Sequence, residues 1–101
     1  MPSNRRLRLS HDADDDLADI LEYTIQTWDE DRAESYKMTI YRACRELAEF
    51  PSLGRLRDDL GEGVRTYVVG QHVVVYRSSE TDLIVSRIIH VRRDIERALR
   101  D

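Results

Sequence analysis

The chain has 101 residues, enough for one folded domain and too few for two, so we expect a single domain over residues 1–101. Its net charge of −4 argues against general binding to nucleic-acid backbones, and its single cysteine, Cys44, excludes an intramolecular disulfide. No apolar run approaches the roughly 20 residues that cross a bilayer, and no secretory signal is recognisable, so we expect a soluble cytoplasmic protein.

The start of the chain predicts a strand followed by a helix. Residues 5–9 place leucines at alternate positions, as in a strand with one apolar face. Ser10 and Asp12 are favourable helix N-caps, and apolar side chains then recur at spacings of three and four, which predicts an amphipathic helix over about 12–28. The apolar stripe of this helix consists of Leu17, Ile20, Leu21, Thr24, Ile25 and Trp28.

The negative charge is concentrated in this part of the sequence. Residues 12–34 carry ten acidic side chains and one basic side chain, Arg32, whereas residues 1–11 carry three arginines and no acid. A solvated helix surface explains such a run, and a docking surface for a basic partner is the functional alternative.

A second helix is predicted after a very short break. Asp29 is a suitable N-cap, and Pro51 ends the helix. Its apolar stripe consists of Ala33, Tyr36, Ile40, Ala43, Cys44, Leu47 and Phe50. Because so few residues separate the two helices, they must fold back on each other as an αα-hairpin.

The second half of the chain predicts β-structure after a polar loop over residues 51–63. Three strands follow, over residues 64–69, 72–77 and 83–91. Gly70 and Gln71 between the first two suit a type II′ hairpin turn, and a short helix over 92–100 closes the chain. The fold class is therefore α+β, with the order β-α-α-β-β-β-(α) and the helical hairpin packed on a small antiparallel sheet.

Both faces of this sheet are predicted to be apolar. With strict alternation, Val73 and Val75 share one face of the strand over residues 72–77, and Val74 and Tyr76 share the other. In the last strand, Val85 and Ile89 share one face, and Ile84 and Ile88 share the other. The helical hairpin covers one face only. The other needs the C-terminal helix, a second copy of the chain or another protein as cover.

The sequence offers no grouped metal ligands and no cofactor motif. His11, His72 and His90 are scattered, and Cys44 lies in a helix stripe. No phosphate-binding loop or nucleophile elbow occurs either, so we expect neither a metal nor a cofactor.

Acid–base chemistry on RNA is one interpretation of the polar residues on the strands. His90 and Tyr76 could transfer protons while Arg65 and Arg87 hold a phosphate, without a metal. The alternative is structural: His90 bonds locally at a strand end, Tyr76 is a buried ring with a satisfied hydroxyl, and Arg87 pairs with an acid.

Two further arginines occupy an unfavourable place. Arg92 and Arg93 are predicted at the start of the last helix, where the helix dipole disfavours cations. Their position therefore indicates a role other than helix stability.

Four segments together resemble a known family. They are "LSHDADDDLADILEYTIQTW", "AESYKMTIYRACRELAEFPSLGR", "VRTYVVGQHVVVYR" and "RIIHVRRDIERAL", and they cover nearly the whole chain. In order and spacing they are similar to the ParE-like toxins of the RelE/ParE superfamily of bacterial type II toxin–antitoxin systems.

The resemblance implies a growth-arresting toxin that a co-expressed, ParD-like antitoxin neutralises in a hetero-oligomer. The antitoxin tail, disordered alone, would fold on the toxin as helix and strand. ParE members act on DNA gyrase, whereas RelE members are ribosome-dependent mRNA interferases. An inactive relative that only binds its antitoxin is a third possibility.

The sequence favours the ParE branch over the RelE branch. RelE-like nucleases are usually strongly basic, whereas this chain is acidic overall and ends in the ParE-type "HVRRD". Under this interpretation there are no catalytic residues. The residues expected to recognise the target, the antitoxin or both are Arg65, Arg77, Arg87, His90, Arg92 and Arg93.

Overall fold

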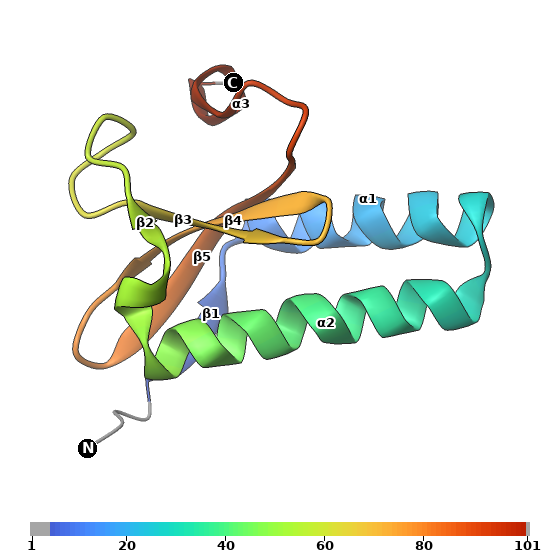
Figure 1. The fold of residues 1–101 in the computed structure, drawn as a ribbon, viewed down its shortest axis with the longest axis horizontal. Helices are drawn as coiled ribbons and strands as arrows, with labels where there is room; N and C mark the ends of the chain where they lie inside the picture. Colours follow the sequence, from blue (N-terminus) through green and yellow to red (C-terminus); the bar gives the residue numbers. More distant parts are fainter. Residues whose placement is uncertain (1–4, 101) are drawn as a thin grey trace.

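The protein consists of a helical hairpin packed against one face of a sheet, with a short helix on the other face (Figure 1). The computed structural model describes residues 5–100. Its elements are β1 (Arg6–Leu9), α1 (His11–Thr27), α2 (Glu30–Glu49), the 3-10 helix η1 (Pro51–Leu53), β2 (Arg55–Leu56), β3 (Arg65–Val69), β4 (His72–Ser78), β5 (Asp82–His90) and α3 (Ile95–Arg100). The predicted α+β class is confirmed. Among the described helices, none has the length and hydropathy required to cross a membrane.

The sheet has the strand order β1-β5-β4-β3-β2. The meander of β3, β4 and β5 is antiparallel, as predicted, but β1 pairs with β5 in parallel, so the sheet is mixed rather than wholly antiparallel. A parallel pair needs a long connection, which the helices and the meander supply. The two-residue strand β2 was not predicted, because so short a segment carries no alternation to detect.

Side-chain caps begin both long helices. Ser10 Oγ accepts a hydrogen bond from the backbone N–H of Ala13 at 3.0 Å, and Asp29 Oδ1 accepts one from the N–H of Arg32 at 2.7 Å. These bonds satisfy N–H groups that have no partner within the helix. The predicted caps Ser10 and Asp29 are confirmed, whereas Asp12 lies inside the first turn of α1, and the predicted bounds of α1 are correct to one residue.

The turn between β3 and β4 has the predicted glycine-dependent geometry. Gly70 has a φ of +58°, whereas no described residue other than glycine, Gln71 included, has a positive φ. A type I′ turn would need positive φ at both central positions, so the backbone fits type II′. A Cβ atom on Gly70 would also lie 2.9 Å from the ring of Tyr36, which leaves no room for a larger residue.

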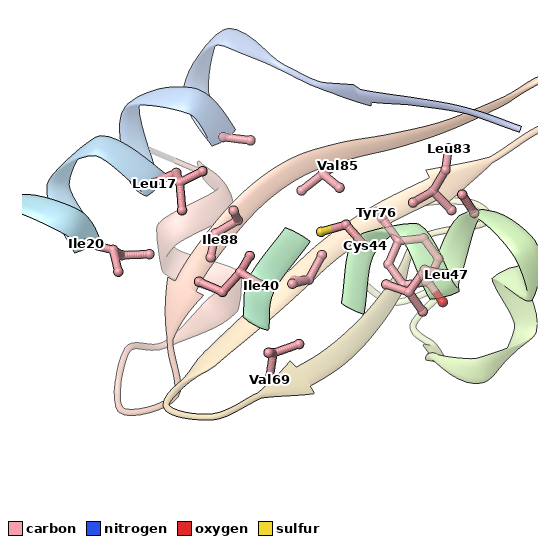
Figure 2. Packing of buried hydrophobic residues seen from close by; sticks show 13 residues of the cluster. Leu17, Ile20, Ile40, Cys44, Leu47, Val69, Tyr76, Leu83, Val85 and Ile88 are labelled. Carbon is pink, nitrogen blue, oxygen red and sulfur yellow. The ribbon is translucent and has the colours of Figure 1, made fainter. Parts of the chain in front are cut away.

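The main core lies between the helical hairpin and the sheet (Figure 2). Tyr76, Ile40 and Leu47 are among its largest fully buried side chains. The stripe of α2 is buried as predicted along most of its length, but Ile25 and Trp28 of α1 are 45% and 61% exposed. Ile25 lies in the last turn of α1 and Trp28 is its C-cap residue, and this end of the hairpin extends past the sheet in Figure 1.

A β-bulge changes the facing of β5. Val75 is opposite Arg87 and Tyr76 is opposite Val85, so Ser86 is an extra residue without a partner on β4. The extra residue shifts the alternation of side chains by one position. Val85 and Ile88 therefore face the main core, while Ile89 faces the other side, and the predicted pairing of Val85 with Ile89 is wrong.

A second, smaller core lies on the opposite face of the sheet, which we call the second face. It contains Val64, Val73, Val75, Ile89 and Ala98, with Leu60, Ile95 and Leu99 packed against it. The helix α3 and the loop before β3 therefore supply cover for part of this face. The expectation that the sheet is apolar on both sides and needs cover on both is confirmed for this part.

Cys44 should be almost inert in the folded protein. Its side chain is 1% exposed, and burial raises the pKa of its thiol to about 11, so little reactive thiolate exists at neutral pH. We expect a thiol reagent to modify the native protein at neutral pH far more slowly than the protein in concentrated urea, measured by mass spectrometry. Equal rates in the two conditions would contradict this packing of α2.

Candidate functional site

Arg87 lies at the bulge of β5 and is held by an acid of α1. Its Nε donates to Asp16 Oδ2 at 2.7 Å, and its Nη2 donates to Asp16 Oδ1 at 3.1 Å. Its Nη1 donates to the carbonyl oxygen of Ala98 in α3 at 3.0 Å. The hydrogen bonds to Asp16 raise the pKa of Arg87. One arginine thus joins α1, β5 and α3, which matches the structural interpretation of this residue.

The Asp16 carboxylate also satisfies the backbone of β5. Because β1 ends before the bulge, the later part of β5 has no strand on that side. Asp16 Oδ2 accepts a hydrogen bond from the N–H of Ile88 at 2.9 Å, and Ser10 Oγ donates to the carbonyl oxygen of Ser86 at 2.8 Å. Side chains at the start of α1 therefore replace the missing strand.

Tyr76 is completely buried and anchors the segment that follows α2. Its hydroxyl donates to the carbonyl oxygen of Pro51 and accepts from the N–H of Gly54 at 2.9 Å. Burial raises the pKa of this hydroxyl. Arg65 Nη1 donates to the carbonyl oxygen of Gly54 at 2.8 Å. Both side chains thus stabilise the same turn, and for Tyr76 this is the structural role considered above.

Arg65 and Arg77 lie on neighbouring strands but on opposite faces. Arg65 is opposite Tyr76 in the β3–β4 ladder and shares its face, whereas Arg77 alternates with it and shares the face of Val75. Arg77 Nε donates to the carbonyl oxygen of Glu62 at 3.2 Å. The two arginines therefore cannot contact one small ligand together.

A cluster of three rings lies where β4 begins and β5 ends. Tyr36 Oη is 2.6 Å from His72 Nδ1, and the rings of His72 and His90 are 5.3 Å apart between centroids. The N–H of Gln71 donates to Tyr36 Oη at 3.0 Å, and the N–H of Arg92 donates to His90 Nδ1 at 3.1 Å. His90 therefore bonds locally at the strand end and also packs against a second histidine.

One of these hydrogen bonds determines which nitrogen of His90 carries the proton. The N–H of Arg92 makes His90 Nδ1 an acceptor, so neutral His90 is protonated at Nε2. Tyr36 Oη accepts from Gln71 and lies within hydrogen-bond distance of both His72 Nδ1 and the carbonyl oxygen of Val69. A metal at Nε2 of His90 would require the opposite tautomer of that ring. Among residues 5–100, no group of three or more His, Cys, Asp or Glu side chains could hold a metal ion.

Arg92 and Arg93 do not start a helix, contrary to the prediction. They lie in an exposed turn between β5 and α3, whose first residue is Ile95. Asp94 supplies the cap, since its Oδ1 accepts from the N–H of Arg97 at 3.3 Å. The argument from an unfavourable helix dipole is therefore wrong. Both arginine side chains remain exposed, and neither forms an ion pair with another residue in the range 5–100.

The four residues considered for RNA cleavage do not converge. His90 is opposite His72, four residues from Tyr76 along β4, which corresponds to about 13 Å of strand. Tyr76 and Arg65 bond to the turn at Gly54, and Arg87 bonds to Asp16 at the bulge. No single phosphate could contact all four side chains in this arrangement.

Comparisons with known proteins agree with this architecture. Residues 7–95 match the family model described as "ParE toxin of type II toxin-antitoxin system, parDE". The chain belongs to the ParE toxin family. It is similar to Toxin ParE1 of Mycobacterium tuberculosis H37Rv, with 34% identity over 95 residues that cover 93% of this chain and 97% of the relative.

Two further similarities extend this family assignment. Toxin ParE1 of Caulobacter vibrioides is 35% identical over 83 residues, which cover 82% of this chain and 85% of the relative. A solved structure titled "Chromosomal ParDE TA system from P. aeruginosa" covers 89% of this chain and 99% of its own, with a TM-score of 0.75. At 20% identity the latter supports the fold alone. This ParE-family protein is thus a ParE-type toxin of a type II toxin–antitoxin system, and the resemblance stated from the sequence is confirmed.

Sequence reasoning missed three residues of this ParE-family site. Asp16 was counted only as part of the acidic run, although it directly precedes Leu17 and so borders the apolar stripe of α1. His72 alternates with Val74 and Tyr76, a pattern that indicates the helix-covered face. Tyr36 was assigned to the core without a partner for its hydroxyl. For each of these residues, the spacing of apolar residues indicates which side of the helix or strand the side chain occupies. Its hydrogen-bond partner can be identified only from the folded structure.

The ion pair at the bulge should make a measurable contribution to stability. Breaking an ion pair that is largely shielded from water leaves a poorly compensated charge, so we expect Asp16→Ala or Arg87→Ala each to lower the free energy of unfolding by about 2 kcal/mol. The double variant should lose clearly less than the sum, measured by urea denaturation. Asp15→Ala, at the exposed neighbour of Asp16, is the control and should change stability by at most about 0.5 kcal/mol. Additive losses would contradict the direct coupling.

His72 should make the protein less stable in mild acid. Burial and the neighbouring His90 lower the pKa of His72 from its ordinary value of 6.5, so the unfolded chain binds the proton more readily. The free energy of unfolding should therefore fall as pH decreases from 6.5 toward the lowered pKa. His72→Gln should reduce this slope.

His11 provides a control of opposite sign for this experiment. Its own backbone hydrogen bond and the charge of Asp15 raise the pKa of His11, so its contribution to stability is complete below 6.5 and is lost as pH rises. His11→Gln should therefore steepen the loss of stability in acid. If His72→Gln leaves the slope unchanged, the protonation of His72 is not coupled to folding.

Proposed function

We propose that this ParE-type toxin arrests bacterial growth by inhibiting DNA gyrase in the cytoplasm, and that a ParD-like antitoxin neutralises it. The observation that carries the proposal is the exposed arginine pair beside His90. Arg92 and Arg93 are presented on a turn that is held by the His90 ring and, through α3, by Arg87. Cations on a supported turn, without acidic partners among the described residues, are suited to contact an acidic surface of a macromolecule.

The arrangement of the polar residues supports an inhibitor rather than a nuclease. An RNA-cleaving site needs its acid, its base and its phosphate-binding groups within hydrogen-bond reach of one phosphate. Here Tyr76 and Arg65 are committed to the turn at Gly54, and Arg87 is committed to Asp16. His90 remains partly exposed and is the residue on which an mRNA interferase, the second candidate, would have to depend.

Exposed apolar residues support the expectation of an antitoxin partner. Near the C-terminal end of α1, Tyr23 is 67% exposed and Trp28 is 61% exposed. Arg32 lies over the Trp28 ring, 4.5 Å from its centroid, but leaves most of it accessible. Large aromatic side chains on a surface commonly mark a protein interface. An antitoxin segment that packs there would remove them from water.

Pulse labelling tests the choice between the two targets. After induction of the gene without an antitoxin, we expect thymidine incorporation to fall before methionine incorporation, because gyrase inhibition stops DNA synthesis first. Co-expression of a neutralising antitoxin should restore both. Should methionine incorporation fall first, the interferase interpretation replaces the gyrase interpretation.

Variants in the same assay test the residues. Arg92→Glu together with Arg93→Glu should weaken the arrest at least tenfold in inducer titration, because these charges would then repel the acidic surface. Arg42→Glu together with Arg45→Glu, at two exposed arginines of α2, is the matched control and should retain full activity. His90→Ala should abolish arrest by an interferase, whereas a gyrase inhibitor need not lose its activity with this substitution. Unchanged arrest in the Arg92/Arg93 variant would exclude these two residues from target recognition.

A further inference from the structure

Part of the second face is left open beside α3, and arginines dominate it. Arg8 of β1 is opposite Ile84 of β5, which is opposite Arg77 of β4, so these three side chains form one row across the sheet. Arg6 lies two residues before Arg8 on the same face. We call these four residues the arginine face. Apart from Arg77, none of its arginines belongs to the set predicted from the sequence.

The arginine face is accessible and largely uncommitted. All four side chains are exposed, and Ile84 is 45% exposed at the centre of the row. Within residues 5–100, Arg6 and Arg8 form neither a side-chain hydrogen bond nor an ion pair, and Arg77 donates only to a backbone carbonyl. Cations gathered around an apolar residue, without local partners, are complementary to a ligand with the opposite pattern.

The spacing of the row indicates the shape of that ligand. Neighbouring strands are about 4.8 Å apart, so Arg8 and Arg77 are separated by about 10 Å with Ile84 between them. An α-helix with its side chains is about 10–12 Å across. A helix laid over Ile84 with an apolar stripe could therefore direct carboxylates on its two flanks to Arg8 and Arg77.

The helix α3 already shows this mode of packing on the neighbouring part of the same face. Ala98, with Ile95 and Leu99, packs against Val73 and its neighbours in the second core. A partner helix on the arginine face would extend the same layer. The occupant would differ from α3 in carrying acids toward the sheet.

We propose that the arginine face binds an acidic amphipathic helix of a partner protein. The inference goes beyond the proposed function, because this surface is separate from the turn at Arg92 and requires neither gyrase nor an antitoxin to be the partner. Nucleic-acid phosphates fit the face less well. Phosphate affinity depends on the number of cations, the whole chain is acidic, and a phosphate offers no apolar surface to pack against Ile84.

The test uses the purified protein and three fluorescent probes in anisotropy titrations. The first probe is a synthetic helical peptide of about 18 residues, with one leucine stripe and glutamates on both flanks. The second has glutamine at every glutamate, and the third is a DNA duplex of similar length. We expect the glutamate peptide to bind at least tenfold more tightly than either other probe, with an affinity that decreases as salt increases.

Two variants assign this binding to the face. Arg6→Glu with Arg8→Glu removes side chains without local partners, so the fold should persist, and affinity for the glutamate peptide should fall at least tenfold. Ile84→Ser should reduce it about threefold through lost apolar contact. Arg42→Glu with Arg45→Glu, at two exposed arginines of α2 on the other side of the sheet, is the matched charge control and should bind as the unmodified protein does. Thermal unfolding verifies that each variant is folded.

Three results would overturn the proposal. One is no saturable binding of the glutamate peptide by the unmodified protein. Another is equal loss of binding in the Arg6/Arg8 and Arg42/Arg45 variants, which would indicate an effect of net charge alone. The third is tighter binding of the DNA duplex than of the peptide, lost in the Arg6/Arg8 variant, which would assign the face to phosphates.

Discussion

The ion pair between Asp16 and Arg87 is the interaction on which the arrangement of this protein depends. It lies where β5 changes the facing of its side chains, and it connects the first helix, the central strand and the last helix through one guanidinium. Without it, the free edge of β5 would lose the acceptor for Ile88, and α3 would lose its polar contact with the sheet. The pair is partly shielded from water, so its charges are strongly coupled.

The bulge explains why one strand serves two cores. Before the extra residue, β5 turns Val85 toward the helical hairpin, and after it Ile88 faces the hairpin while Ile89 faces α3. The same change places Arg87 where it reaches both Asp16 and α3. A regular strand could not offer these contacts from consecutive residues. The supported turn that carries Arg92 and the open arginine face are both consequences of this local irregularity.

The predictable part of the fold is the part with a repeating pattern. The stripe of α2, the caps Ser10 and Asp29 and the turn at Gly70 each follow from local chemistry. The bulge at Ser86 has no such signal, because one inserted residue leaves the apolar composition of β5 unchanged. The sequence could suggest an acidic partner for Arg87 but could not identify it, since that partner lies 71 positions away in the chain. The sequence was sufficient to name individual residues of the candidate site. It was not sufficient to predict that these residues lie too far apart in the fold to act on one ligand.

The parallel pairing of β1 with β5 has a consequence for synthesis of the protein. Among the described strands β1 is made first, yet its neighbour in the sheet, β5, is made after all the others. The helical hairpin is therefore made before the strands that bury its apolar stripe, and this stripe stays uncovered until those strands have been made. Asp16 likewise has no ion-pair partner until Arg87 of β5 has been made. A nascent chain cannot complete the surface that presents Arg92 until the sheet closes, so the order of synthesis delays folding of the toxin until β5 has been made.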